Sequence, residues 1–553
     1  MSHIGPAKKS SGSVPPGREA ARPDPQLFPG HPRKLRNVYA CLVHESQECV
    51  VDLVRNLRCL DPDSTILLYN GGEDGSLLSP RSCFDKLGAR IHPRARPIQA
   101  GNVYQFALDC MQFAGDELGF DVLTIVDSDQ LSLQSGWTEA VAQQLASASG
   151  PVTGVAGGPD ESGGVGLLGQ GIGGKAAQPL PPQTRVTPAI GAWQELALWR
   201  PLLRRFKDGE SQFPRWIAWP SAVFTAPAAR ELCAWFARDE ELRTIVAQSR
   251  VWAKEQVVFP TLTALLGFKV VPCPGSSEFV KYQVKYDQEQ THAALEDEQV
   301  YWMHPVPRRY DDLTRKAVRA HFDQYRRAVS IPSRPALRAT ISPVNDQIRR
   351  PILEQMRNIE GWLTAAEADL LISLAQQALT DCPHVSAVVE VGSYCGKATT
   401  VLGGVVRAVR ATARVWAIDP HDGFVGAHDH GLERVAKPTL ELLRQNIERA
   451  QLSPFVEIVQ GRAQDVPWSE PVCLLLIDGL HDYPSVLRDF THFESFLVDG
   501  GLVAFHDYAD YFPGVPAFVD ELSASGRYQT VARARSLIAL RKLPSRPPDV
   551  PLH

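Results

Sequence analysis

The chain has 553 residues, too many for one hydrophobic core, and its length corresponds to two large α/β domains or to about three to four smaller ones. Its 44% apolar and 22% charged residues are typical of an ordinary soluble globular protein. The formal net charge of −5 gives no basic footprint, so we expect no nucleic-acid partner.

The termini and the cysteines indicate where the protein works. Residues 1–34 are rich in Ser, Pro, Gly and basic residues without an apolar run, which predicts a disordered tail rather than a secretory signal. Elsewhere no stretch approaches the roughly 18 consecutive apolar residues of a membrane span. The ten cysteines are scattered, without a C-x-x-C pair or a metal-ligand spacing. They resemble reduced core residues, and we expect a cytoplasmic protein.

A first α/β domain is predicted from residue 35 to residue 328. Its opening part alternates short apolar runs with segments of helical period. The predicted strands are 38–43, 64–69 and 121–126, and the predicted helices are 49–57 and 103–118.

Two carboxylates follow the third of these strands. Asp127 and Asp129 are one residue apart at a strand end, so they point to the same side and can hold a divalent cation against a diphosphate. Such a cation would neutralise the charge that develops on a leaving nucleoside diphosphate. The alternative is a solvated turn or a helix cap, because Asp often occupies turns.

Other stretches of this domain also allow two interpretations. The glycine-rich segment 155–175 suits a loop that closes over a donor, or an unstructured insertion. The aromatic run 216–220 offers rings for stacking on sugars, or belongs to the core. Glu255 begins a predicted helix, where a carboxylate can act as general base for a sugar hydroxyl.

These features together resemble the GT-A glycosyltransferases. The stretches Glu255-x-x-x-x-Pro260-Thr261 and His304-Pro305-Val306 are similar to the core-2/I-branching type. The resemblance implies a nucleotide-sugar donor, Mg²⁺ or Mn²⁺ on Asp127 and Asp129, Glu255 as the base, and His304 as a further ligand of the metal or phosphate. Because the branching enzymes do not depend on an Asp-x-Asp metal site, metal binding by Asp127 stays open.

A linker is predicted at 329–355, where four prolines lie among basic and polar residues without sustained periodicity. A helix follows within 359–379, with Thr364 as N-cap and Glu367 as its capping-box partner. We expect it to open a second domain at 356–545, ahead of a short tail at 546–553.

The second domain is organised around the stretch Val388-Val389-Glu390-Val391-Gly392-Ser393-Tyr394-Cys395-Gly396-Lys397. It predicts a strand, a glycine turn and a helix whose free N–H groups face a ligand. Asp419 ends the next strand, where a carboxylate can take both ribose hydroxyls. The Glu-x-Gly-x-x-x-Gly pattern lacks the Gly-x-Gly-x-x-Gly of dinucleotide binders, which favours S-adenosylmethionine.

Further strands complete this pattern. Seven strands are predicted at 386–391, 414–419, 456–460, 472–478, 502–507, 528–532 and 537–541, the last two as a hairpin. Polar residues follow two of them, at 478–483 and 506–508. The domain resembles the class I S-adenosylmethionine-dependent methyltransferases, and its motifs are similar to those of the macrocin-type O-methyltransferases. The expected fold is therefore α/β throughout: a GT-A-like fold followed by a Rossmann-like seven-stranded sheet.

This second resemblance implies roles for individual residues. The expected cofactor-binding residues are Glu390, Gly392, Ser393 and Gly396 at the methionine part, Asp419 at the ribose, Gly461 and Ala463 along the adenine, and Asp478.

The chemistry at the acceptor leaves two routes open. Asp478 and Asp507 could bind Mg²⁺, which would lower the pKa of an acceptor hydroxyl. His481 or His506 could instead remove the proton directly, and Asp478 is a further catalytic candidate. Macrocin-type enzymes tend to have an Asp-Asp pair where this chain has His506-Asp507, which leaves the metal open.

The sequence thus predicts a bifunctional enzyme. A methyltransferase domain (EC 2.1.1) would act on a sugar or glycosylated acceptor, alongside a glycosyltransferase-like domain (EC 2.4). The alternative is a small-molecule methyltransferase whose first domain binds a glycan without catalysis. The acceptor, the donor sugar, the linkage and the oligomeric state are not encoded in recognisable motifs.

Overall fold

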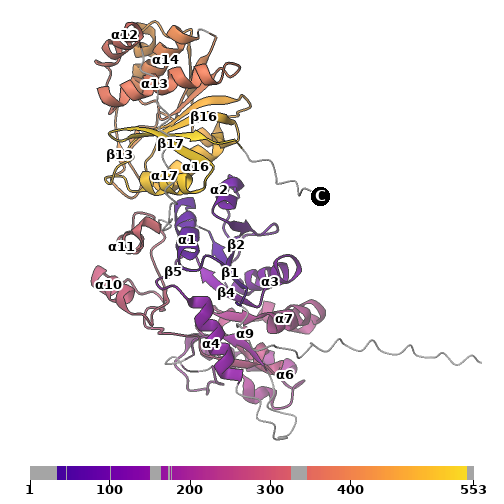
Figure 1. Cartoon of the computed structure of the whole chain (residues 1–553). Helices are drawn as coiled ribbons and strands as arrows, with labels where there is room; N and C mark the ends of the chain where they lie inside the picture. The colour runs from indigo at the N-terminus through magenta and orange to yellow at the C-terminus, as the bar shows by residue number, and fades with distance from the viewer. Residues whose placement is uncertain are drawn as a thin grey trace, which may run out of the picture. The chain divides into compact units, whose positions relative to one another are not determined.

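The computed structural model describes residues 34–44, 46–99, 101–149, 164–171, 175, 177–325, 345–410 and 412–544 (Figure 1). Almost all of the two predicted tails, most of the glycine-rich segment 155–175 and residues 329–344 of the predicted linker lie outside these ranges. The described residues form two seven-stranded sheets, which we treat separately.

The first sheet has the strand order β3-β2-β1-β4-β7-β6-β8. Its strands are β1 (Asn37–Val43), β2 (Thr65–Asn70), β3 (Ala89–Ile91), β4 (Val122–Asp127), β6 (Val165–Leu168), β7 (Val223–Thr225) and β8 (Lys269–Val271). Only β7 runs antiparallel to its neighbours. The three strands predicted in the opening part are confirmed. Residues 165–168 form a strand of the sheet, so the prediction of a loop over 155–175 was wrong there.

Helices cover both faces of this sheet. They are α1 (Gln47–Leu60), α2 (Arg81–Lys86), α3 (Val103–Phe113), α4 (Trp137–Ser149), α5 (Thr187–Gln194), α6 (Leu196–Leu203), α7 (Ala226–Arg238), α8 (Glu240–Gln248), α9 (Glu255–Leu265), α10 (Gln288–Glu296) and α11 (Leu313–His321). Side chains of β1 alternate, so that Tyr39 packs on the α1 side and Val38 on the α3 side. The predicted helix at 103–118 is confirmed as α3, which continues into a π-helical turn, Ala114–Leu118.

A small second sheet lies beside the end of β4. β5 (Leu131–Ser132) pairs antiparallel with β9 (Trp302–Met303). Because Asp127 ends β4 and His304 follows β9, this pairing brings residues more than 170 positions apart to one place.

The sheet of the second domain has the order β14-β11-β10-β15-β16-β18-β17. Its strands are β10 (Ala387–Val391), β11 (Arg414–Asp419), β14 (Val456–Gln460), β15 (Val472–Ile477), β16 (Leu497–Phe505), β17 (Tyr528–Ala534) and β18 (Leu537–Lys542). The first five are parallel, and β17 and β18 form an antiparallel hairpin at one edge. All seven predicted strands are confirmed.

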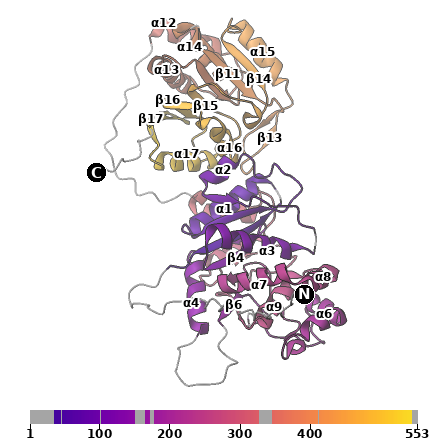
Figure 2. The same cartoon turned by 90° about the vertical axis from the view of Figure 1, so that its right-hand side faces the viewer.

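Two layers of helices enclose this sheet (Figures 1 and 2). On one face lie α12 (Asp346–Met356), α13 (Ala365–Asp381), α14 (Lys397–Val409) and α15 (Thr439–Arg449). On the other lie α16 (Tyr483–Glu494) and α17 (Gly514–Ala524). The predicted capping box is confirmed, since Thr364 and Glu367 bond reciprocally at the start of α13.

The predicted linker is partly helical, which corrects the sequence interpretation. Residues 346–356 form α12 although Pro351 lies inside it. Its buried side chains, Ile352 and Met356, are four residues apart and therefore lie on one face. Ile352 packs so closely on α14 that a side chain at Gly404 would meet it. This tertiary packing outweighs the helix-breaking tendency of proline.

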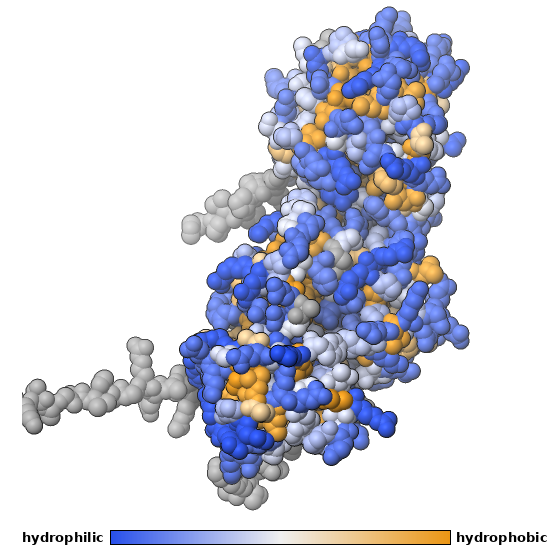
Figure 3. Space-filling view, turned by 180° about the vertical axis from the view of Figure 1, so that it is seen from behind, coloured by the Kyte–Doolittle hydropathy of each residue, from blue (hydrophilic) through white to orange (hydrophobic). Residues whose placement is uncertain are grey.

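The face of the protein drawn in Figure 3 is mainly hydrophilic. In Figure 3, hydrophobic side chains emerge in separate groups among hydrophilic ones. Across the described ranges, none of the helices combines the length and apolar character that crossing a membrane requires. All ten cysteines lie in the described ranges, and eight of them are buried, as expected of core residues.

Candidate functional site

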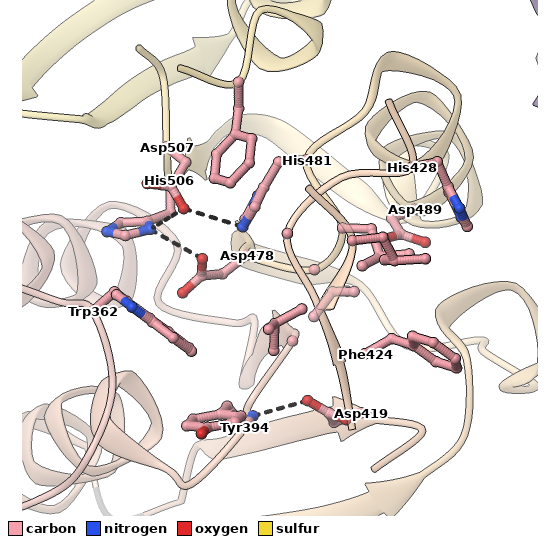
Figure 4. Close-up of a pocket in the computed structure, with 18 of the residues that line it drawn as sticks. Trp362, Tyr394, Asp419, Phe424, His428, Asp478, His481, Asp489, His506 and Asp507 are labelled. Carbon is pink, nitrogen blue, oxygen red and sulfur yellow. Dashed lines mark hydrogen bonds and ion pairs between the residues drawn. The ribbon is translucent and has the colours of Figure 1, made fainter. Parts of the chain in front are cut away.

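A cavity of about 1040 Å³ opens at the carboxyl ends of the parallel strands of the second sheet. Its walls come from the loops that follow β10, β11, β14, β15 and β16. This is where an open α/β sheet holds its ligands. Figure 4 shows the side chains that point into it.

The glycine turn after β10 forms the floor of the cavity. Gly392 has φ +90°, and a Cβ on it would lie 2.1 Å from the carbonyl oxygen of Asp478. Only glycine lets the end of β10 approach the end of β15 so closely. Gly396 also has positive φ and forms the N-cap of α14, whose free N–H groups face the turn.

Asp419 is oriented by the backbone. Its Oδ2 accepts a hydrogen bond from the N–H of Tyr394 (2.8 Å) and its Oδ1 one from the N–H of His421 (2.6 Å). Three residues here have a positive φ: Tyr394 (+46°), His421 (+54°) and Asp507 (+57°). Non-glycine residues rarely adopt this conformation, and all three line or border the cavity. Asp419 lines the cavity, and its contact with a ribose stays a prediction.

Glu390 lies below the turn. It is completely buried, its Oε2 accepts a hydrogen bond from Thr399 (2.6 Å), and its Oε1 has no hydrogen-bond partner among the described residues. Burial raises the pKa of Glu390 to about 8. Glu390, Ser393 and Gly396 do not themselves line the cavity, in contrast to Gly392 and Asp419.

The turn after β14 also lines the cavity, and its place along the adenine stays a prediction. Gly461, Ala463 and their neighbours Arg462 and Gln464 all contribute to the wall. The N–H of Gly461 donates to the carbonyl oxygen of Asp419 (3.0 Å), which joins this turn to the end of β11.

Asp478 and Asp507, which end adjacent strands, are brought together around a histidine. His506 Nδ1 lies 3.1 Å from Asp478 Oδ1 and 3.2 Å from Asp507 Oδ2, and its Nε2 lies 3.6 Å from Glu367 (Figure 4). Burial alone would lower the pKa of His506, but the three carboxylates raise it strongly. The three carboxylates therefore favour the cationic form of His506, which offsets part of their charge. The sequence does not reveal this role, because the partners come from three separate elements.

His481 forms a dyad with Asp507. Its Nε2 lies 3.1 Å from Asp507 Oδ2, and its ring packs on Phe512 at 4.6 Å between centroids. The Tyr511 hydroxyl donates to the other oxygen of Asp507 (2.7 Å). Burial lowers the pKa of His481, so the imidazole is neutral at neutral pH and can accept a proton.

The first domain contains a second acidic cluster at the end of β4. Asp127, Asp129 and His304 offer ligand atoms that all lie within 4.8 Å of one another. His304 Nε2 lies 3.3 Å from Asp129 Oδ1 and 3.9 Å from Asp127 Oδ2, while its Nδ1 contacts the Lys281 carbonyl oxygen at 2.8 Å. Burial alone would lower the pKa of His304, but the two carboxylates raise it.

Arginines fix the turn that carries these aspartates. Arg308 pairs with Asp129 (3.0 Å) and donates to the Ser128 hydroxyl (3.0 Å). The fully buried Arg315 donates to the Ser128 carbonyl oxygen (3.0 Å) and to Asp52 (2.9 Å).

Glu255 is the first residue of α9 and is 4% exposed. Burial raises its pKa to about 8, the charge of Asp127 adds to this, and Oε2 has no hydrogen-bond partner among the described residues. In the aromatic run at 216–220, Trp219 is 2% exposed and stacks on Phe259, which confirms the core interpretation for that ring.

Comparisons with known proteins agree with the fold of the second domain. A family model described as a methyltransferase domain matches residues 389–508. The chain is similar to the solved O-methyltransferase NovP, with 18% identity and a TM-score of 0.30 over 36% of this chain and 98% of that one. It is similar to the calicheamicin methyltransferase CalS11, with 14% identity and a TM-score of 0.28 over 36% and 93%. SAH-bound PaMTH1 from Podospora anserina matches with 11% identity and a TM-score of 0.25 over 36% and 88%.

The second domain is therefore a class I methyltransferase domain that uses S-adenosylmethionine (EC 2.1.1). The family match does not extend to the first domain.

The residues of the cavity fit this cofactor. Gly392 lines the cavity, Asp419 is preset by two backbone N–H groups, and Glu390 Oε1 has no hydrogen-bond partner in the described part of the chain. Asp478, His481 and Asp507 also offer ligand atoms within 4.8 Å of one another, so the donor set for a hard cation is present.

Proposed function

We propose that the second domain methylates a hydroxyl oxygen of a sugar or glycosylated acceptor, with His481 as general base. When bound, S-adenosylmethionine supplies a methyl group on a sulfonium, so the leaving thioether is neutral and needs no acid. What the protein has to supply is alignment and removal of the acceptor proton.

The observation that carries this proposal is the dyad of His481 and Asp507. With the proton of the neutral imidazole on Nε2, where Asp507 accepts it, Nδ1 is the nitrogen that can accept a proton. Nδ1 makes no hydrogen bond to any residue in the described part of the chain. The imidazolium formed by proton transfer would be stabilised by Asp507, which is itself held by Tyr511.

Magnesium on Asp478 and Asp507 is the alternative way to activate the acceptor. The magnesium route is supported by the ligand atoms of Asp478, His481 and Asp507, which lie close together. It is opposed by His506, which lies between the two carboxylates and offsets their charge.

The rim of the cavity favours a ring-shaped acceptor. Trp362, Phe424 and Tyr511 line it and are 62%, 44% and 56% exposed. Large hydrophobic side chains are seldom left this exposed without a partner, and aromatic faces suit the C–H groups of a sugar ring.

The test is transfer of labelled methyl from S-adenosylmethionine to a panel of glycans and glycosylated small molecules, with and without EDTA. We expect labelling of a sugar hydroxyl that persists in EDTA and is lost in His481→Ala. Loss of labelling in EDTA, with recovery on adding Mg²⁺, would establish the metal route. Labelling only of acceptors that lack a sugar would contradict the proposed substrate class.

For the first domain we propose a GT-A-type glycosyltransferase that takes a nucleotide sugar. Its support is the convergence of Asp127, Asp129 and His304, a set of ligands that suits Mg²⁺ or Mn²⁺ beside a diphosphate. Glu255 would be the base, because a buried carboxyl with a pKa near 8 is matched to proton transfer at neutral pH.

A glycan-binding module without catalysis is the alternative for this domain. Asp127→Asn and Asp129→Asn separate the two, because an enzyme would lose hydrolysis or transfer of a nucleotide sugar. A module would keep its glycan binding in both variants and would show neither reaction in the unaltered protein.

A further inference from the structure

Asp489 is a buried carboxyl that faces the cofactor cavity. It lies on α16, is 8% exposed and lines the cavity. Among the residues that the structure describes, none makes a hydrogen bond to its side chain. A carboxyl withdrawn from bulk water without a partner is costly, which points to a ligand that supplies the missing partner.

The neighbouring backbone leaves room for this carboxyl. A Cβ on Gly479 would lie 3.0 Å from Asp489 Oδ2, closer than such atoms normally approach. Gly479 does not have positive φ, so space rather than backbone conformation is what glycine provides here. The end of β15 thus lets Asp489 reach past it to the cavity.

Asp489 lies on the side of the cavity where the adenine is expected. Helix α16 packs against the turn Ala463–Asp465, which follows β14 and lies along the expected adenine site. Arg462, in the same turn, is close enough to influence the Asp489 carboxyl. The ribose is expected at Asp419. In Figure 4, Asp489 lies away from Trp362 and His506, which are at the end of the cavity where methyl transfer would occur.

The protonated form of Asp489 suits a nucleobase whose edge both donates and accepts a hydrogen bond. Burial raises the pKa of Asp489 to about 7; Arg488 and Arg462 oppose this and Asp482 adds to it. A neutral carboxyl has one O–H donor and one carbonyl acceptor, side by side. The edge of adenine presents the complementary pair, its amino group and N1.

We propose that Asp489 is the adenine-recognising residue of the cofactor site: its carbonyl oxygen accepts a hydrogen bond from the exocyclic amino group, and its hydroxyl donates to N1. Gly479 keeps the path between them open. This inference rests on binding of S-adenosylmethionine by the domain and is independent of the acceptor that is methylated.

The experiment measures binding by calorimetry, without turnover. The ligands are S-adenosylhomocysteine and its analogue that carries purine in place of adenine and so lacks the amino group. The proteins are the full chain and its variants Asp489→Asn and Asp489→Leu, of similar side-chain size. Asn keeps a neighbouring donor and acceptor, whereas Leu keeps neither.

We expect the unaltered protein to bind S-adenosylhomocysteine about tenfold more tightly than the purine analogue, the scale of one hydrogen bond. Asp489→Asn should keep this preference within about threefold. Asp489→Leu should lose this preference and bind both ligands about equally, because S-adenosylhomocysteine loses both hydrogen bonds whereas the analogue loses only the one to N1. The two losses should therefore not add.

Several results would overturn the inference. One is equal binding of both ligands by the unaltered protein, which needs no variant. Another is an equal loss of both ligands in Asp489→Leu, which would indicate a merely structural role. If that variant does not fold, Gly479→Ala tests the same contact by displacing the carboxyl, and an unchanged preference there would contradict the proposal. Failure of the unaltered protein to bind S-adenosylhomocysteine at all would overturn the cofactor assignment as well.

Discussion

The two domains place the same residue types at corresponding points of their sheets. In the first, Asp127, Asp129 and His304 meet beside the end of β4, and in the second Asp478, His481 and Asp507 meet beyond β15 and β16. Their surroundings differ in where a positive charge comes from. In the first, His304 has its Nδ1 tied to a backbone carbonyl and faces both carboxylates with Nε2.

In the second cluster His506 lies between Asp478 and Asp507, whereas in the first Arg308 pairs with Asp129 from one side. Burial lowers the pKa of His481, and the charge of His506 adds to this. Under the roles proposed above, the first cluster would hold an external cation and the second would move a proton, because His506 lies between the two carboxylates of the second. The comparison teaches that the neighbours of a donor set, as well as its composition, bear on its chemistry.

The largest expected effect tests His481 as a base. His481→Ala should lower the rate of methyl transfer by about 100-fold to 10,000-fold, the usual contribution of general-base catalysis. Binding of S-adenosylhomocysteine should change less than about threefold, because His481 lies at the acceptor end. His384→Ala, an exposed histidine before β10, is the matched control and should keep full activity. An equal loss of rate and cofactor affinity would contradict the assignment.

The next effect concerns how the second cluster is positioned. Gly392→Ala should destabilise the protein by about 2 to 4 kcal/mol, because left-handed strain adds to a clash with the Asp478 carbonyl. Gly500→Ala has similar positive φ but nothing within 4 Å, so it should cost only about 1 kcal/mol. Denaturant unfolding of both variants measures the difference. Equal costs would show that the close approach of β10 and β15 does not matter.

The sequence revealed strands and their ends more readily than it revealed which side chains from separate elements meet in the fold. The parallel strands of the second domain are continuous apolar runs that end in polar residues, so β11 and β14 were predicted to the residue. Helix α12 was missed because Pro351 hides the pattern of Ile352 and Met356. Asp489 was missed because a carboxylate on an amphipathic helix looks solvated, and only the fold shows that it faces the cavity.

A smaller effect tests the first cluster as a cation site. Asp129→Asn should weaken Mn²⁺ binding by at least about tenfold, since it removes a charge from the donor set. Asp507→Asn, the corresponding change in the second domain, should leave that Mn²⁺ site unaltered. Calorimetry with Mn²⁺ on the full chain distinguishes them. If Asp507→Asn removes the Mn²⁺ site and Asp129→Asn does not, the proposed roles of the two clusters are reversed.

A pH-dependent effect concerns the buried carboxyl beside each cluster, Glu390 and Glu255. Burial raises the pKa of both to about 8, against an ordinary value of 4.5, so in the folded protein they stay protonated where the unfolded chain is ionised. Below pH 4.5 both states are protonated and nothing is lost. Between pH 4.5 and 8, each residue should lower stability by up to about 1.4 kcal/mol per pH unit, with no further change above.

Glu390→Gln and Glu255→Gln should each remove one such contribution. The stability of a variant relative to the unaltered protein should then rise with pH across that window, as measured by denaturant unfolding at several pH values. In Glu390→Gln the amide oxygen can still accept the hydrogen bond from Thr399, so packing is kept and ionisation alone is changed. A relative stability that stays flat with pH would mean that the carboxyl finds a charged partner or water in the folded state. If only one of the two variants gave such a flat profile, the two clusters would differ in how well these acids are buried, as well as in the positively charged side chains around them.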